Sequence, residues 1–155
     1  MENFLINTFK QNTISLKNML SSFNNEDMFL STGNSNTIGW IFGHIIYERG
    51  IIIKVFNKEF EIPEKENVFQ RGAPKNKTIA VDMEEFLKVF VERGEQIISE
   101  INKAGDEGLK KNFPGKHPFG GDDVESLLHF LSWHETFHLG QIDLIKAATG
   151  KGGMK

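Results

Sequence analysis

The sequence predicts an all-α protein, a four-helix bundle with long connections between its second and third helices and between its third and fourth. Apolar residues recur at spacings of three and four along four long segments, and no segment alternates as a strand does. Stretches that contain Gly, Pro or Asn separate these segments, and such residues interrupt helices. For a chain of 155 residues we expect a single domain, residues 1–155.

The first two helices are expected at residues 2–23 and 37–57. The second is apolar almost all round, which is typical of a helix that is buried on more than one side. The connection between them, residues 24–36, contains Gly33, and Ser35 or Asn36 is the expected N-cap of the second helix.

The third helix is expected to begin after Asp82 as its N-cap, because Glu85 follows three residues later in a capping-box pattern. Gly105 is its expected end. The preceding connection, residues 58–81, contains Pro63, Gly72 and Pro74 (a connection this long usually has a function or crosses the bundle).

The fourth helix follows a second long connection, residues 106–121. It is expected to open at Asp122, with Glu125 as the partner in its capping box, and to end at Gly150.

Composition excludes several classes of function. Eighteen basic and 21 acidic residues give a net charge of -3, which offers nothing to nucleic acid or to an anionic membrane. Residues 38–56, the most apolar segment, include His44, Glu48, Arg49 and Lys54 and are not a credible membrane span. Cysteine is absent, so disulfides and thiolate sites are excluded, and we expect a cytoplasmic protein without a signal peptide.

The string His134-Glu135-Thr136-Phe137-His138 lies within the fourth helix and is its most informative feature. Two histidines four residues apart lie one turn apart on one helix face, where they can share a metal ion. The string also matches H-E-x-x-H, the zinc-peptidase motif whose Glu is a general base. The peptidase interpretation is disfavoured, because neither a Glu after Glu135 nor a His after His138 is available as the third ligand.

Metal binding is favoured for the two histidines over the alternative of two hydrogen-bonded core residues. They continue a stripe at helical spacing that includes Leu131 and Ile145, so we expect them to point inward. Two unpaired buried imidazoles would cost about 1–3 kcal/mol each, and a shared metal satisfies both.

A third ligand has to come from elsewhere in the chain. His129 lies about 140° around the helix from His134 and is poorly placed. His117 lies in a loop, where a solvated side chain is the default. His44 is better placed, in the apolar second helix, although spacing alone does not prove its role.

The chain resembles the DinB/YfiT-like family of metalloenzymes in two places. One is residues 37–44, Thr-Ile-Gly-Trp-Ile-Phe-Gly-His; the other is residues 127–142, where the histidine pair is followed by Leu-Gly-Gln-Ile. The resemblance implies a four-helix bundle, commonly a homodimer, in which His44, His134 and His138 hold a divalent metal, nickel or zinc. Many members have Arg or His where this chain has Leu139.

Three neutral histidines leave positions on a metal open, as in catalytic sites. Related branches resemble transferases that use bacillithiol, mycothiol or glutathione. The leading hypothesis is therefore a metal-dependent S-transferase that joins a low-molecular-weight thiol to small electrophiles. The alternative is a non-catalytic, dimeric stress-response or binding module with a structural or vestigial metal site.

Other charged residues near the histidines have two interpretations each. Glu48 and Glu135 either orient an imidazole or a bound water, or are solvent-facing charges or members of helix ion pairs. Arg71 and Lys75 either meet an anionic thiol or are solvated.

A second apolar face of the fourth helix contains Trp133, Phe137, Gly140 and Leu144. It either packs within the chain or forms an interface with a second copy, and Gly140 would allow a close approach.

Overall fold

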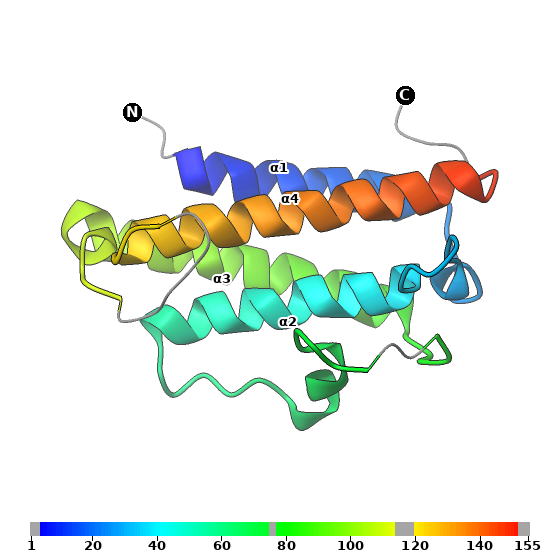
Figure 1. Ribbon diagram of the computed structural model, residues 1–155. Helices are drawn as coiled ribbons and strands as arrows, with labels where there is room; N and C mark the ends of the chain where they lie inside the picture. The colour runs from blue at the N-terminus through cyan, green and yellow to red at the C-terminus, as the bar shows by residue number, and fades with distance from the viewer. Residues whose placement is uncertain (1–3, 75–76, 114–119, 152–155) are drawn as a thin grey trace.

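Four long helices pack against one another in the computed structural model, and this confirms the predicted helical bundle (Figure 1). The structure describes residues 4–74, 77–113 and 120–151. The elements are α1 (Phe4–Leu20), η1 (Asp27–Phe29), α2 (Ile38–Phe56), η2 (Glu64–Phe69), α3 (Met83–Leu109) and α4 (Val124–Ala148), where η denotes a 3₁₀-helix. The backbone of these ranges forms no strand, only an isolated bridge between Asn112 and Asp123. None of the helices described is both long and apolar enough to cross a membrane.

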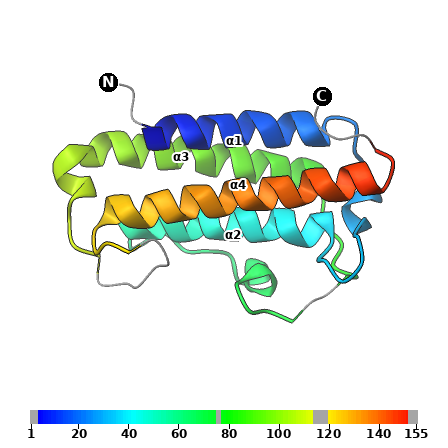
Figure 2. The same cartoon turned by 45° about the horizontal axis from the view of Figure 1, so that its top comes forward.

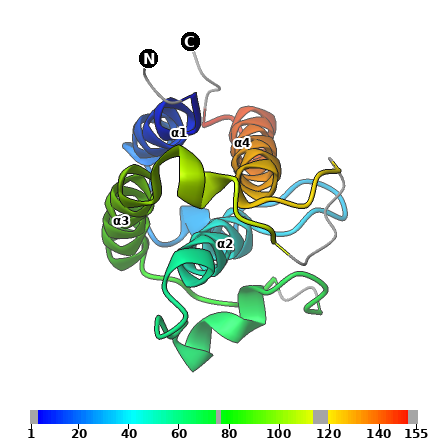
Figure 3. The same ribbon diagram turned by 90° about the vertical axis from the view of Figure 1, so that its left-hand side faces the viewer.

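The order of the helices around the bundle places α2 beside α4. Each of α1 and α2 packs against both α3 and α4, and a view along the helix axes shows the four at the corners of a square (Figure 3). Helices α1 and α4 run in one direction, and α2 and α3 run in the other (Figures 1 and 2). Because α2 and α3 are parallel, the connection that contains η2 has to return along the length of the bundle, on the outer side of α2.

The interior is filled by apolar side chains from all four helices. They form two clusters, one that includes Phe42, Phe90 and Ile142 and another that includes Phe9, Ile97 and Leu128. Helix α2 is buried along most of its length, as its apolar composition predicted.

The N-caps of α2 and α4 lie one or two residues later than predicted. Thr37, not Ser35 or Asn36, caps α2 by accepting a hydrogen bond from the amide of Trp40. The hydroxyl of Ser35 instead accepts from the amide of Thr32 in the preceding turn. Asp123, not Asp122, caps α4 by accepting from the amide of Ser126.

The shift at α4 has a local cause. The carbonyl of Asp122 accepts from the amide of Phe113, and Asp123, which is extended at φ -115° and ψ 164°, forms the isolated bridge with Asn112. The helix therefore begins one residue later.

The boundaries of α3 follow the prediction more closely. Asp82 is its N-cap and accepts from the amide of Glu85, as predicted. Gly105 has a positive φ of 58°, which ends the regular helix, and one further helical turn leads to Leu109. A left-handed residue of this kind is favourable for glycine because it has no Cβ.

A buried arginine connects all four helices. Arg49 of α2 has no exposed surface, and its guanidinium binds the Glu135 carboxylate of α4 through two hydrogen bonds of 2.8 Å. The same guanidinium donates to the carbonyl of Phe90 in α3 and, at 2.9 Å, to the hydroxyl of Thr13 in α1. Gly94 of α3 leaves room for it, since a Cβ there would lie 2.5 Å from Nη1.

We expect Glu135→Gln to lower the free energy of unfolding by about 3–5 kcal/mol, because it leaves the buried charge of Arg49 without its counter-ion. Urea denaturation of the chelator-treated protein measures this loss. The double variant Arg49→Met/Glu135→Leu should lose less than the single variant, since it leaves no unpaired charge. The surface substitution Glu92→Gln is the control, and a double variant as unstable as Glu135→Gln would contradict the prediction.

Candidate metal centre

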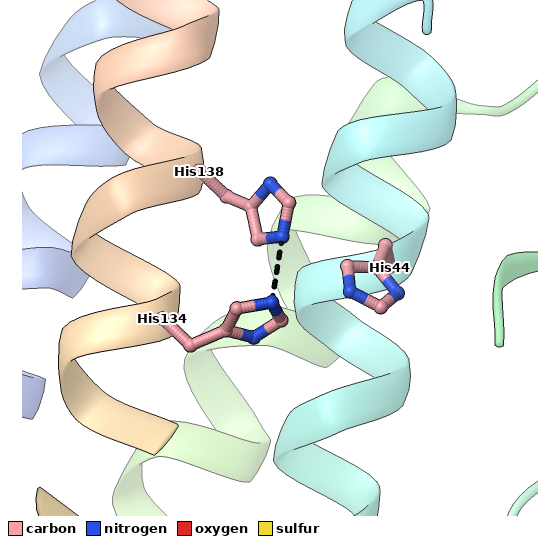
Figure 4. A group of neighbouring side chains, drawn as sticks. All are labelled: His44, His134 and His138. Atoms are coloured by element: carbon pink, nitrogen blue, oxygen red, sulfur yellow. Dashed lines mark hydrogen bonds between the residues drawn. The ribbon is translucent and has the colours of Figure 1, made fainter. Parts of the chain in front are cut away.

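Three histidines from two helices meet between α2 and α4 (Figure 4). His44 comes from α2, and His134 and His138 come from successive turns of α4. One nitrogen of each ring lies within 4.8 Å of the corresponding nitrogens of the other two. His44 is buried, and the other two are half-buried. The structure thus brings together the three residues that the sequence singled out as metal ligands.

Hydrogen bonds fix which nitrogen is available in two of the three rings, those of His44 and His138. Nδ1 of His44 donates to the carbonyl of Phe69 at 2.7 Å, since a carbonyl oxygen can only accept. Nδ1 of His138 donates to Oε1 of Gln141, also at 2.7 Å. In the neutral ring each Nε2 then carries a lone pair, which is the form that binds a metal.

The remaining contact in the cluster joins Nε2 of His138 to Nε2 of His134 at 3.1 Å. Two neutral imidazoles that meet nitrogen to nitrogen need either a proton or a cation between them. Zinc–nitrogen bonds of about 2.0–2.1 Å at tetrahedral angles place two ligand nitrogens about 3.3–3.4 Å apart. Small shifts of the rings, chiefly of His44, would let the cluster hold a divalent ion, so these residues fit a metal.

The last two residues of η2, Val68 and Phe69, hold His44 in position. Trp40, one turn before His44, stacks on its ring with the centroids 5.2 Å apart and donates from Nε1 to the carbonyl of Val68 at 3.2 Å. The next carbonyl, that of Phe69, accepts from His44. Gly43 makes this arrangement possible, because a Cβ there would lie 2.5 Å from the ring of Phe69.

Burial keeps all three histidines in their uncharged form at neutral pH. Burial lowers the pKa of His134 and His138 to about 4. Repulsion from the positive charge of a protonated His44 contributes to both shifts. Burial also lowers the pKa of His44. Neutral imidazoles bind a metal without first releasing a proton.

Two charged groups lie near the cluster. Oε1 of Glu48, one turn after His44, is 3.9 Å from Nε2 of His44, and burial raises the pKa of this carboxyl. The exposed guanidinium of Arg71 acts electrostatically on His44, His134 and Glu48. The site therefore combines neutral nitrogen donors with one carboxylate and one arginine.

The other residues considered from sequence lie elsewhere. Both carboxylate oxygens of Glu135 bind Arg49, so the Glu of the H-E-x-x-H string is not a free base as a peptidase requires. His129 stacks on Phe4, with centroids 6.0 Å apart. His117 and Lys75 lie outside the described residues.

Sequence reasoning missed the groups that position the histidines. The carbonyl of Phe69 lies 25 residues from His44 in the chain, and a backbone group has no sequence signature. Gln141 did have one, because it lies three residues after His138 and is therefore its neighbour on the helix face.

The fold and the site define a four-helix bundle with a cluster of three histidines that could hold a metal ion. The sequence profile of the DinB superfamily matches residues 9–142. The chain belongs to this superfamily, which confirms the resemblance noted from the sequence. No curated protein sequence matches the chain significantly.

The low pKa of His134 and His138 predicts how stability depends on pH. As the pH falls from 6.5 towards 4, the unfolded chain binds protons at these histidines and the folded chain does not. The chelator-treated protein should therefore lose stability across this window and keep it above pH 6.5. Urea denaturation at a series of pH values measures the slope. The double variant His134→Asn/His138→Asn should show a shallower slope, and an equal slope would contradict the assignment.

Proposed function

We propose that the protein is a cytoplasmic, metal-dependent S-transferase that joins a low-molecular-weight thiol to small electrophiles, with nickel or zinc held by His44, His134 and His138. The observation that carries the proposal is the convergence of three neutral imidazoles, two of them half-buried, at one point of the bundle. Three protein ligands leave further positions for exogenous groups, which is the arrangement of catalytic rather than closed structural sites.

The charges of the site favour an anionic sulfur. A divalent metal held by these imidazoles would keep a net positive charge, and it would lower the pKa of a thiol there. In the reaction, the sulfur forms a bond to carbon, the carbon–halogen bond of an electrophile such as chlorobimane breaks, and the thiol proton and the halide leave. Arg71 adds a positive charge beside His44 and Glu48, where the acidic groups of a thiol cofactor would be attracted.

The residues around the metal ligands have supporting roles in this proposal. Phe69 and Gln141 hold the rings of His44 and His138 so that Nε2 stays a lone-pair donor. Trp40 covers one face of His44 and limits the access of water to it.

We expect zinc- or nickel-loaded protein to accelerate the conjugation of bacillithiol, mycothiol or glutathione to monochlorobimane, as measured by the fluorescence of the thioether. His44→Ala, or a chelator, should reduce this acceleration by roughly 100-fold or more, since each removes the metal or a ligand that holds it. His129→Ala is the matched control, because His129 lies outside the cluster. The transferase proposal is wrong if no thiol reacts faster with the loaded protein. If His134→Ala unfolds the chain, the metal is mainly structural.

We also propose that the protein is a homodimer that uses the second apolar face of α4. Leu144 is 65% exposed and Phe137 is 50% exposed, and a Cβ at Gly140 would meet nothing within 4 Å. Exposed apolar side chains beside an open glycine are typical of a face that a second copy covers.

Leu144→Glu should shift the protein from dimer to monomer in analytical ultracentrifugation, because it places a charge in the proposed interface. Phe29→Glu, which changes an exposed apolar side chain of η1, is the control and should leave the mass unchanged. A monomeric wild-type protein at micromolar concentration would refute the dimer.

A further inference from the structure

Glu48 differs from the other acidic residues of the interior in its partners. Glu66 and Glu135 are each held by an arginine through two hydrogen bonds, from Arg93 and Arg49 respectively. The side chain of Glu48 is 18% exposed, and its one ion-pair contact within the described residues is with His44. Arg71 acts on it only electrostatically. A carboxylate removed from water in this way needs a cation or a donor to offset its lost hydration.

The position of the carboxylate indicates which cation that is. Glu48 lies one turn after His44 on the same face of α2, and its Oε1 lies 3.9 Å from Nε2 of His44. Nδ1 of that ring is bound to Phe69, so Nε2 is the nitrogen available to a metal. The carboxylate thus lies beside the metal-binding atom of the ring and not beside its hydrogen-bonded side.

The distance is close to what a common metal would require. Nitrogen and oxygen ligands about 2.0–2.2 Å from one ion, at tetrahedral to octahedral angles, lie about 2.9–3.5 Å from each other. Oε1 of Glu48 has to move by less than about 1 Å relative to His44 to reach this range, and the flexible side chain of Glu permits it. The three histidines themselves have to contract from their spread of 4.8 Å.

We propose that Glu48 is the fourth protein ligand of the metal, so that the centre consists of three imidazoles and one carboxylate. The negative charge would reduce the net charge of a divalent centre from +2 to +1. The inference rests on the metal site of the proposed function, and it is independent of the thiol reaction, because binding of the metal can be measured without any substrate.

The experiment compares metal binding by the full-length wild-type protein, Glu48→Gln and Glu48→Asp after treatment with a chelator. Isothermal titration with zinc at pH 7 should show an affinity about 10- to 100-fold lower for Glu48→Gln, whose amide keeps the size of the side chain and removes its charge. The zinc affinity of Glu48→Asp should lie between those of the wild type and Glu48→Gln, because this variant keeps the charge on a shorter side chain. Cobalt(II) serves as a spectroscopic probe, and its visible absorption bands should shift in Glu48→Gln when an oxygen ligand is lost.

Glu92→Gln is the matched control, since it removes the same charge from an exposed position of α3. It should bind zinc as the wild type does and give the same cobalt spectrum. Thermal unfolding of the chelator-treated variants checks that they fold. Glu48→Gln should be at least as stable as the wild type, because it removes a half-buried charge whose one ion-pair contact in the described part of the chain is with His44.

The proposal is overturned if the zinc affinity of Glu48→Gln stays within twofold of the wild type and the cobalt spectra coincide. If Glu48→Gln does not fold, the same comparison is made with Glu48→Asp, and wild-type affinity and spectrum in that variant count against the proposal. If His44→Ala loses zinc binding and Glu48→Gln does not, the three histidines are metal ligands and Glu48 is not. Failure of the thiol reaction would leave either result unaffected.

Discussion

The buried ion pair between Arg49 and Glu135 is the constraint on which the site depends. Its guanidinium contacts all four helices, and the two hydrogen bonds to Glu135 fix the rotation of α4 about its own axis relative to α2. Successive residues of a helix point about 100° apart. With Glu135 directed into the centre of the bundle, the adjacent His134 is turned towards α2, and His138 follows one turn later. A buried charge is strongly destabilising unless it is paired. Any rotation of α4 that separates Glu135 from Arg49 would therefore lower the stability of the bundle.

The direction of the helices supplies the second constraint. Because α2 and α3 are parallel, the chain between them returns along the outer side of α2 (Figure 1). That path carries the carbonyls of Val68 and Phe69 past Trp40 and His44, whose rings donate to them. The long connection between α2 and α3 thereby fixes the orientation of the His44 ring. An antiparallel hairpin with a short turn would bring no backbone to this side of α2.

How much could be predicted from the sequence depends on the range of the interaction. The sequence predicts the histidine pair because helical spacing within α4 is local. His44 is favoured as the sole histidine of an apolar helix, and its role as a ligand is implied by the resemblance to the DinB/YfiT-like family. The predicted cap of α4 lies one residue too early, since contacts with the preceding segment, from Phe113 to Asp122 and from Asn112 to Asp123, decide where the helix begins. The partner of Glu135 lies 86 residues away and the carbonyl for His44 lies 25 residues away. Contacts of this kind depend on the packing of the helices and not on local pattern.

The H-E-x-x-H string shows why a motif needs its surroundings before it has a function. In zinc peptidases its glutamate must remain free to act as a base beside the metal. Here both oxygens of that glutamate are bound by an arginine that is itself fully buried, and breaking this pair would leave the arginine without its counter-ion. Glu135 therefore cannot act as a catalytic base unless the ion pair breaks and the fold loses stability. Glu48, which we propose as the carboxylate ligand, comes from the opposite helix and has no competing arginine within hydrogen-bonding distance among the described residues. Within residues 134–138, the glutamate thus stabilises the fold, and the two histidines form part of the candidate metal site.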